Sequence, residues 1–264
     1  MNGCEDRLSA TRSHYEEQPF DFMVGNESLD IEEYQPMPFK HFVASYLKPG
    51  EKVADVGCGP GRDLCYLRQK GCEVTGVDIS PKSIELARKR VPDGRFVCAS
   101  NLRLPIEDEE FDAVVSDGVI HHTPDARLAL LEDARILKRG GCMYLAVYRR
   151  WRYYYYMYTY IGRPVRYIEK FAPGKLLIKC TLIPLYFLAH KIKHGRNRNW
   201  KGVQHLFYDY LITPQATFHT REQIVGWGAD FGLDLVEYFE HGLGNCHAFI
   251  FRKKLKKINE VTCI

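Results

Sequence analysis

Three glycines at alternate positions mark the part of the chain whose spacing is best suited to holding a ligand. Gly57, Gly59 and Gly61 directly follow the apolar run at 53–56 and directly precede a helical pattern. Glycine at such a turn lets the backbone bend sharply and lets a ligand approach the main chain closely. The dinucleotide fingerprint G-x-G-x-x-G needs its last glycine at position 62, where this chain has Arg62. The spacing therefore disfavours a nicotinamide dinucleotide.

A carboxylate stands where a ribose would need one. Asp78 closes the next predicted strand, 17 residues after Gly61. At the carboxyl end of that strand, its oxygens can accept hydrogen bonds from both hydroxyls of a ribose. Together with the glycine loop, Asp78 predicts a nucleoside-containing cofactor. The structural alternative is that both features only form turns between strands and helices.

The same loop resembles motif I of the class I S-adenosylmethionine-dependent methyltransferases. The resemblance rests on the G-x-G-x-G spacing and on an acid, Asp55, two residues before the first glycine. It implies S-adenosylmethionine as the cofactor, with the loop cradling its methionine and ribose parts. The cofactor-binding positions expected in this region are Asp55, Gly57, Cys58, Gly59, Gly61, Asp78 and Ile79.

A second stretch, FVCASNLRLPIEDEEFDAVVSDGVIHHTPD at 96–125, is similar to the segment that follows in that family. The resemblance implies that its first part lies beside the adenine and its second part near the methionine end. The family usually has aspartate where this chain has Ser100, so Asn101 is expected to substitute in contacting the adenine amino group. The implied cofactor contacts are Ser100, Asn101, Leu102, Ser116, Asp117 and Gly118.

The N-terminal segment HYEEQPFDF at 14–22 is similar to a segment that folds over the cofactor in many such enzymes. By that likeness Tyr15 caps the site and excludes water. The alternative is a frayed amphipathic terminus with no role in binding.

Histidines and one acid are the candidates for a catalytic base. Methyl transfer from a sulfonium is an in-line displacement, so alignment supplies much of the rate enhancement, up to about 7–11 kcal/mol. A base is needed only where the acceptor must lose a proton. His121 and His122 follow the fourth predicted strand, and Asp209 lies in LFYDYLITPQATFHT; a structural or charge-pairing role is the alternative for all three. Further candidates are His205, His219 and His241.

Short β-rich runs alternate with helical patterns, which predicts a parallel sheet covered by helices. Strands are expected at 52–56, 73–79, 94–100, 111–118 and 142–148, and helices at 62–71, 80–90 and 125–141, the last stopped by Gly140 and Gly141. A helix at 220–232 and an antiparallel hairpin at 233–240 and 245–253 follow. The fold class is α/β, and the resemblance implies a doubly wound, seven-stranded Rossmann-like sheet. A helical cap insertion is predicted between strand five and the last helix.

Charge separates the cap from the rest. Residues 149–210 hold thirteen lysines and arginines against two acids, a charge of +11, so the remainder carries 4 − 11 = −7. The expected organisation is an N-terminal helical segment at 1–45, a cofactor-binding core at 46–148, a basic, tyrosine-rich cap at 149–219, and the end of the core sheet at 220–264.

Composition excludes several other classes. The chain of 264 residues is 45% hydrophobic and 27% charged, as in a soluble globular protein. The apolar run at 176–189 contains Lys179 and Pro184 and falls short of the ~20 residues of a spanning helix, and no signal peptide is recognised. Nine cysteines form no C-x-x-C pair, so we expect reduced core cysteines, no metal site and a cytoplasmic protein.

The cap admits three interpretations. It forms an aromatic lid over an apolar substrate, or it contacts an anionic membrane peripherally through 149–201, or it binds nucleic acid. The last is disfavoured, because the N-P-P-Y type tetrapeptide of enzymes that methylate base amines is absent after strand four. The sequence thus predicts a methyltransferase acting on a small, aromatic or lipid-like acceptor at oxygen, nitrogen or carbon. The alternatives are a catalytically silent cofactor-binding scaffold and a membrane-associated lipid or quinone methyltransferase.

Overall fold

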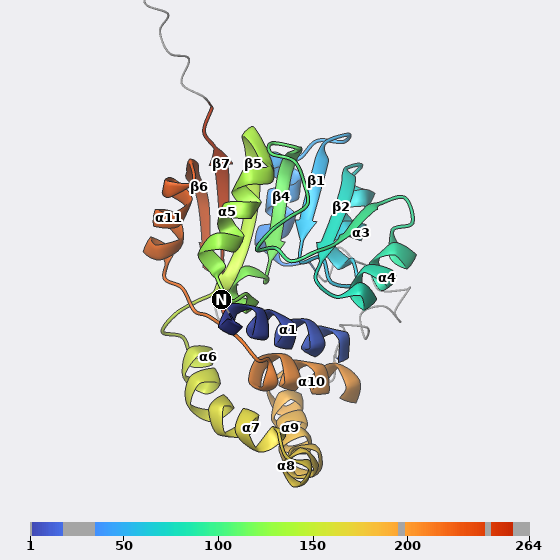
Figure 1. Cartoon of the computed structure of the whole chain (residues 1–264), viewed down its shortest axis with the longest axis vertical. Coiled ribbons are helices and arrows are strands. Elements are labelled where there is room, and N and C mark those ends of the chain that lie inside the picture. The colour runs from blue at the N-terminus through green and yellow to red at the C-terminus, as the bar shows by residue number, and fades with distance from the viewer. Residues whose placement is uncertain (1, 18–34, 195–198, 241–243, 256–264) are drawn as a thin grey trace, which may run out of the picture.

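The computed structural model describes residues 2–17, 35–194, 199–240 and 244–255. One seven-stranded sheet with helices on both faces forms the core, and a group of helices lies beyond one edge of that sheet (Figure 1). The strands are β1 (Lys52–Val56), β2 (Glu73–Asp78), β3 (Arg95–Cys98), β4 (Phe111–Asp117), β5 (Leu137–Tyr148), β6 (Leu233–Glu240) and β7 (Cys246–Lys253).

The helices fall into a core set and a cap set. The core set is α1 (Asn2–Glu17), α2 (Met37–Tyr46), α3 (Arg62–Gln69), α4 (Pro81–Arg90), the short η2 (Ile120–His122), α5 (Ala126–Ile136) and α11 (Arg221–Asp230). The cap set is α6 (Tyr153–Tyr156), η3 (Met157–Ile161), α7 (Gly162–Glu169), α8 (Ala172–Leu177), η4 (Ile178–Leu182), α9 (Ile183–His194), α10 (Trp200–Phe207) and η5 (Tyr208–Ile212). Of these, η3, η4 and η5 are π-helical turns.

The sheet order is β3-β2-β1-β4-β5-β7-β6. Strands β1 to β5 pair in parallel, whereas β7 runs antiparallel to both β5 and β6. The predicted α/β fold with one antiparallel strand at the end of the chain is therefore confirmed. This order brings the ends of β1, β2 and β4 side by side, which is where an open α/β sheet binds ligands.

Apolar side chains fill both faces of the sheet, because every central strand is buried on both sides. On one face, Phe39 and Phe42 of α2 are fully buried, and their ring centroids lie 5.2 and 5.6 Å from that of Tyr144 on β5. This packing fixes the segment after the N-terminal helix against the core.

The helix that follows β2 begins as its sequence predicts. Ser80 accepts a hydrogen bond from the Ser83 N–H, and Pro81 occupies the first helical position. An N–H at the first helical position has no partner within the helix, so proline, which lacks an N–H, loses no hydrogen bond there. Ser80 and Pro81 together therefore fix the start of α4. This start places Asp78 three residues before Pro81, the first residue of the helix.

The prediction for the helix before β5 was wrong at its end. The helix was expected to continue to Gly140 and Gly141, but α5 ends at Ile136 and β5 begins at Leu137. Leu137 pairs with Phe111 of β4, and the pairing then shifts register before Ala113. A Cβ on Gly141 would lie 2.6 Å from the Asp112 carbonyl oxygen, so glycine is needed within this irregular strand.

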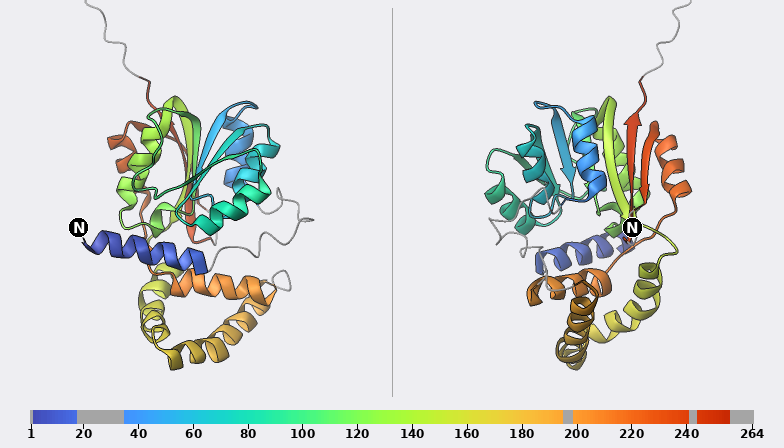
Figure 2. Two further views of the ribbon diagram at one scale, coloured as in Figure 1. Left: turned by 45° about the vertical axis from the view of Figure 1, so that its right-hand side comes forward. Right: turned by 180° about the vertical axis from the view of Figure 1, so that it is seen from behind.

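Two adjacent segments join the cap to the core. The segment after β5 and the segment before α11 pair through the Arg150 N–H, which donates to the His219 carbonyl, and the His219 N–H, which donates to the Tyr148 carbonyl. The helix α1 lies between the lower edge of the sheet and the cap helices in both views of Figure 2. The helix α1 and the cap therefore lie on the same side of the sheet as the carboxyl ends of the parallel strands.

The seven cysteines between positions 58 and 246 are free thiols, and none of them is in a disulfide. Cys58, Cys72 and Cys142 are buried, as expected for core residues. Cys98 and Cys180 are exposed, which corrects the expectation that the cysteines serve as core residues throughout.

A buried acid on α5 makes the stability of the fold depend on pH. Asp133 is fully buried, and burial raises its pKa to about 8, although the nearby Ser116 hydroxyl lowers it in part. Because the folded protein binds the Asp133 proton more tightly than the unfolded chain does, this proton stabilises the fold. The stabilisation is complete below the pKa of the unfolded state and is lost as the pH rises toward 8. We therefore expect Asp133→Asn to raise the free energy of unfolding near pH 7, by at most about 4 kcal/mol.

Denaturant unfolding at acidic and at mildly alkaline pH measures this effect. The gain of Asp133→Asn over the natural protein should grow with pH, because only the natural protein carries the titrating group. An equal difference at both pH values would show that Asp133 keeps an ordinary pKa.

Candidate functional site

The glycine loop turns at the end of β1 in a conformation that glycine favours. Gly57, Gly59 and Gly61 have φ of +81°, +51° and +85°. A Cβ on Gly57 would lie 2.3 Å from a methyl of Val119, whereas a Cβ on Gly59 would meet no atom within 4 Å. The loop is therefore packed tightly at its first glycine and faces open space at its second.

Asp78 is oriented by two backbone groups of this region. The Gly59 N–H donates to one carboxylate oxygen at 2.9 Å, and the Ser80 N–H donates to the other at 2.8 Å. Burial raises the pKa of Asp78 to about 6, and these two hydrogen bonds oppose the rise. Because each carboxylate oxygen accepts more than one hydrogen bond, Asp78 retains acceptor capacity for two hydroxyls.

The site also contains a cation, Arg62, that the sequence motifs did not predict. The Arg62 guanidinium donates to Asp63 at 2.7 and 3.1 Å and to Asp117 at 3.1 Å. Asp55 is buried at the end of β1, one of its carboxylate oxygens has no partner among the described residues, and burial raises its pKa. A signal was present in the sequence, since a charged residue directly follows the glycine loop and three acids lie at the same strand ends.

The residues expected beside the adenine follow β3. The Ser100 hydroxyl accepts a hydrogen bond from the Leu102 N–H at 3.2 Å and so closes a local turn. The side-chain nitrogen of Asn101 is buried and has no hydrogen-bond partner within the described ranges. Ile79 lies next to Asp78, and its carbonyl oxygen is 3.8 Å from the Cys98 thiol. Asn101 is thus the one of these side chains with a buried nitrogen donor that has no partner among the described residues.

The three positions expected near the methionine end do not share one environment. Ser116 is fully buried, and its hydroxyl lies beside Asp133 between β4 and α5. Asp117 faces Arg62, and Gly118 has φ of +80° with no atom within 4 Å of an added Cβ. Only Asp117 and Gly118 therefore lie on the side of the loop.

His121 is held inside the structure. Its ring is fully buried, its centroid lies 3.7 Å from that of Tyr148, and its Nδ1 accepts a hydrogen bond from the Tyr148 N–H at 3.2 Å. The His121 carbonyl also accepts from the N–H of Thr217 at 2.8 Å. These contacts join the end of β4 to the segment that returns from the cap.

His122 makes a similar connection. Its Nδ1 lies 2.8 Å from the Gln215 carbonyl oxygen, which can only accept, so Nδ1 carries the proton. Burial lowers the pKa of His122 to about 4 and that of His121 well below its ordinary value. Both rings are therefore neutral near pH 7, and both hold the return segment of the cap.

Asp209 stands among tyrosines on the π-helical turn η5. Burial raises its pKa to about 7, and no side chain within the described ranges pairs with its carboxylate. The same carboxylate raises the pKa of Tyr15, Tyr148, Tyr154 and Tyr210, which places these four hydroxyls near it. We call these five residues together the Asp209 chamber.

Tyr15 connects the Asp209 chamber with the glycine loop. Its pKa is raised by burial, by Asp209 and by Asp78, so its hydroxyl is within electrostatic reach of both carboxylates. Its ring centroid lies 6.1 Å from that of His122. Residues 18–22, the rest of the segment expected to fold over the cofactor, lie outside the described residues.

The remaining histidine candidates are spread over the molecule. His205 is buried on α10, and His219 lies 2.9 Å from the Thr217 hydroxyl on the return segment. His241 lies outside the described residues.

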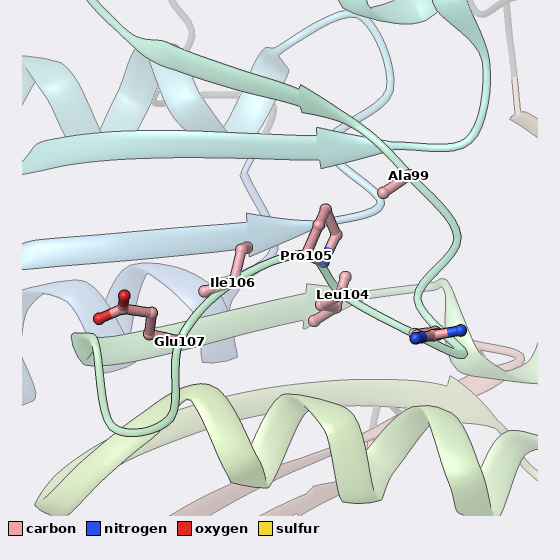
Figure 3. Close-up of a pocket in the computed structure, with 6 residues that line it drawn as sticks. Ala99, Leu104, Pro105, Ile106 and Glu107 are labelled. Carbon is pink, nitrogen blue, oxygen red and sulfur yellow. The ribbon is translucent and has the colours of Figure 1, made fainter.

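A hollow of about 620 Å³ lies on the segment between β3 and β4. Figure 3 shows that its lining runs from Ala99 at the strand ends back to Glu107. Arg135 holds this segment by donating to the carbonyl oxygens of Leu104 and Ile106. The hollow begins beside Ser100, one of the candidate site residues, and extends away from the carboxyl ends of the strands.

The fold and the loop define a class of protein. Residues 54–145 match the family model described as a methyltransferase domain. Together with the sheet order, the G-x-G-x-G turn and Asp78 at the end of β2, this match supports a class I S-adenosylmethionine-dependent methyltransferase.

The relatives differ in what they are named for. An uncharacterized methyltransferase of Synechocystis is 35% identical over 120 residues, which are 45% of this chain and 53% of that protein. The human "Probable tRNA methyltransferase 9B" is 42% identical over 104 residues, which are 38% of this chain and 22% of that protein. The chain thus spans about half of the first relative and about a fifth of the second.

A solved structure extends the likeness of the fold to most of the chain. The magnesium protoporphyrin IX methyltransferase of Synechocystis, solved with bound S-adenosylhomocysteine, has a TM-score of 0.59 and 14% sequence identity. The alignment covers 94% of this chain and all of that one. At this identity the comparison concerns the fold.

The cofactor is S-adenosylmethionine, and the residues present fit it. Gly59 leaves room for a ligand against the main chain, and the Asp78 carboxylate keeps acceptor capacity for ribose hydroxyls. The unpartnered side-chain nitrogen of Asn101 offers a donor beside the base. When bound there, the cofactor supplies a methyl group on a positively charged sulfur.

Proposed function

We propose that this chain transfers a methyl group to a small molecule held in the Asp209 chamber. The observation that carries the proposal is the position of Tyr15, whose ring lies 6.1 Å from that of His122 and whose pKa is raised by both Asp209 in the cap and Asp78 at the end of β2. A ligand at the glycine loop and a ligand beside Asp209 would thus share one enclosed space. Tyr15 and α1 exclude water from that space.

Asp209 is the proposed general base. A base works best when its pKa is near the operating pH, and the pKa of Asp209 is raised to about 7. The pKa of His122 is lowered to about 4, so its imidazole is a much weaker proton acceptor. Asp209 would accept the proton of an acceptor hydroxyl or ammonium group, while His121 and His122 position the return segment that follows it.

The enclosed site supports a small acceptor. Four tyrosine hydroxyls surround Asp209, and the cap and α1 cover the strand ends, so the chamber suits a compact molecule with hydrogen-bonding groups. The likeness of the fold to a porphyrin methyltransferase agrees with this choice, whereas the human relative named for tRNA shares only part of the chain. A catalytically silent scaffold would not need a base with a raised pKa.

Labelled S-adenosylmethionine tests the proposal. Purified protein is incubated with methyl-labelled cofactor and with separate pools of small molecules, tRNA and protein. We expect label in a small molecule extracted from the first pool. Label in tRNA or protein would reject the acceptor class, and cofactor binding without transfer to any pool would favour the scaffold.

A further inference from the structure

The outermost helical run of the cap exposes a wide apolar surface. The segments α8, η4 and α9 form a continuous helix, and 11% of the most apolar window within Ala172–Ile192 is buried. The exposed fractions of its large apolar side chains are 64% for Leu176, 51% for Leu177, 64% for Leu185, 57% for Leu188 and 79% for Ile192. A soluble surface rarely exposes so many neighbouring large apolar side chains.

These side chains form a stripe along one face. Leu177, Leu185, Leu188 and Ile192 follow one another at spacings of eight, three and four residues, which places them on one side of a helix. On another side, Ile178 and Ile183 are buried against the apolar interior of the cap. We call the exposed side the cap-tip stripe.

The helix has the length and composition to span a bilayer, which differs from the expectation drawn from the run at 176–189. Its packing favours a different arrangement. Spanning would remove Ile178 and Ile183 from the cap interior and would place Lys175 and Lys179 within hydrocarbon. A helix with one side buried in the protein and an exposed apolar stripe on another is suited to lie in the plane of a membrane surface.

Charge around the stripe determines which surface it fits. Lys170, Lys175 and Lys179 are exposed along this part of the cap, and Glu169 is the only acid between positions 149 and 208 of the sequence. An exposed apolar stripe on a cap segment rich in exposed lysines is complementary to anionic headgroups above hydrocarbon. An ordinary protein partner would need a matching apolar groove with an acidic rim.

A second row of exposed side chains lies on the preceding cap helices. Tyr153, Tyr156, Tyr160 and Tyr167 are spaced by three, four and seven residues and are 47–67% exposed. Tyrosine combines an apolar ring with a polar hydroxyl and is enriched at membrane–water interfaces. This row leads to Phe171, which is exposed at the start of the cap-tip helix.

We propose that the cap-tip stripe docks the protein on an anionic membrane surface. In Figure 1 the helices α8 and α9 lie at the end of the molecule farthest from the sheet, so docking there leaves the core in water. The inference goes beyond the proposed function and does not require it. If both hold, the acceptor can enter the Asp209 chamber from the bilayer, a consequence that does rest on the proposed function.

Sedimentation with vesicles tests the docking. The natural protein is compared with a Leu185→Glu, Leu188→Glu variant and with a matched control, Leu128→Glu, Leu131→Glu, on α5. The control leucines are 38% and 40% exposed, and they lie on α5 beside the sheet and not on the cap. Vesicles of phosphatidylcholine with phosphatidylserine are used beside vesicles of phosphatidylcholine alone, at low and at high salt.

We expect the natural protein and the α5 control to sediment with the anionic vesicles, and more weakly at high salt. The cap-tip variant should bind these vesicles at least about tenfold more weakly than the natural protein, because two leucines no longer enter the apolar layer. Equal sedimentation of all three proteins, or none for the natural protein, would overturn the proposal. A dimer in solution that only the cap-tip variant loses would assign the stripe to a second copy instead. Titration of each protein with S-adenosylmethionine keeps a failure of docking distinct from a failure of the cofactor site.

Discussion

Replacing Asp209 by asparagine is expected to lower the rate of methyl transfer roughly 10²–10⁴-fold, the usual contribution of a general base. Asparagine keeps the size and one acceptor oxygen of the side chain but takes up no proton. The affinity for S-adenosylmethionine should stay unchanged, because Asp209 lies on the cap side of Tyr15. Initial rates with the acceptor found in the labelling experiment, together with calorimetry of the cofactor, measure the two effects.

The pH profile distinguishes a base from a structural acid. Because the pKa of Asp209 is raised to about 7, kcat of the natural protein should rise with pH through that value as the carboxylate loses its proton. Asp209→Asn should lack this rise. The variant should also gain stability at mildly alkaline pH, since an acid with a raised pKa loses its stabilising contribution as the pH rises through that pKa.

The matched control for this variant is Glu169→Gln. Glu169 is the other acid of the cap and pairs with Lys175 at 3.8 Å. Its replacement removes the same charge from the same region, so its rate and pH profile should match the natural protein. Full activity of Asp209→Asn would reject the base assignment and favour an acceptor that binds without an ionisable proton.

Replacing Gly59 by arginine is expected to weaken S-adenosylmethionine binding by about a hundredfold or more, because the ligand and the new side chain would compete for the same space. In the protein alone, an added Cβ at Gly59 meets no atom within 4 Å, so the variant should fold. Its φ of +51° adds only local strain. Calorimetric titration with S-adenosylmethionine and S-adenosylhomocysteine measures the loss.

Gly226→Arg provides the control. Gly226 is exposed on α11, and an added Cβ there also meets no atom within 4 Å. This variant introduces the same side chain and charge away from the strand ends, so its cofactor affinity should equal that of the natural protein. Equal affinity of the Gly59 and Gly226 variants would show that the loop does not cradle the cofactor.

The core could be predicted from the sequence because its signals are local. The strand at 52–56, the glycine turn and the Ser80–Pro81 helix start each depend on residues within a few positions of one another. The end of α5 could not be predicted, because Leu137 leaves the helical pattern in order to pair with Phe111 of β4. That pairing is a tertiary contact with no counterpart in the local sequence.

The candidate site was predictable in part for the same reason. Asp78 and the glycines are close in the chain, whereas Tyr15 and Asp209 are almost 200 positions apart and meet only through the fold. The motif could not show that Ser116 faces Asp133, because β4 is buried on both sides. The roles of His121, His122 and Asp209 stay predictions until the variants are measured.

A crystal structure with bound S-adenosylhomocysteine tests the central claim most directly, namely that cofactor and acceptor share one space closed by Tyr15. We expect the ribose on Asp78, the base beside Asn101, and the sulfur facing the Asp209 chamber. A ligand bound on the glycine loop with its sulfur turned away from Asp209, or with Asp209 open to solvent, would contradict the account.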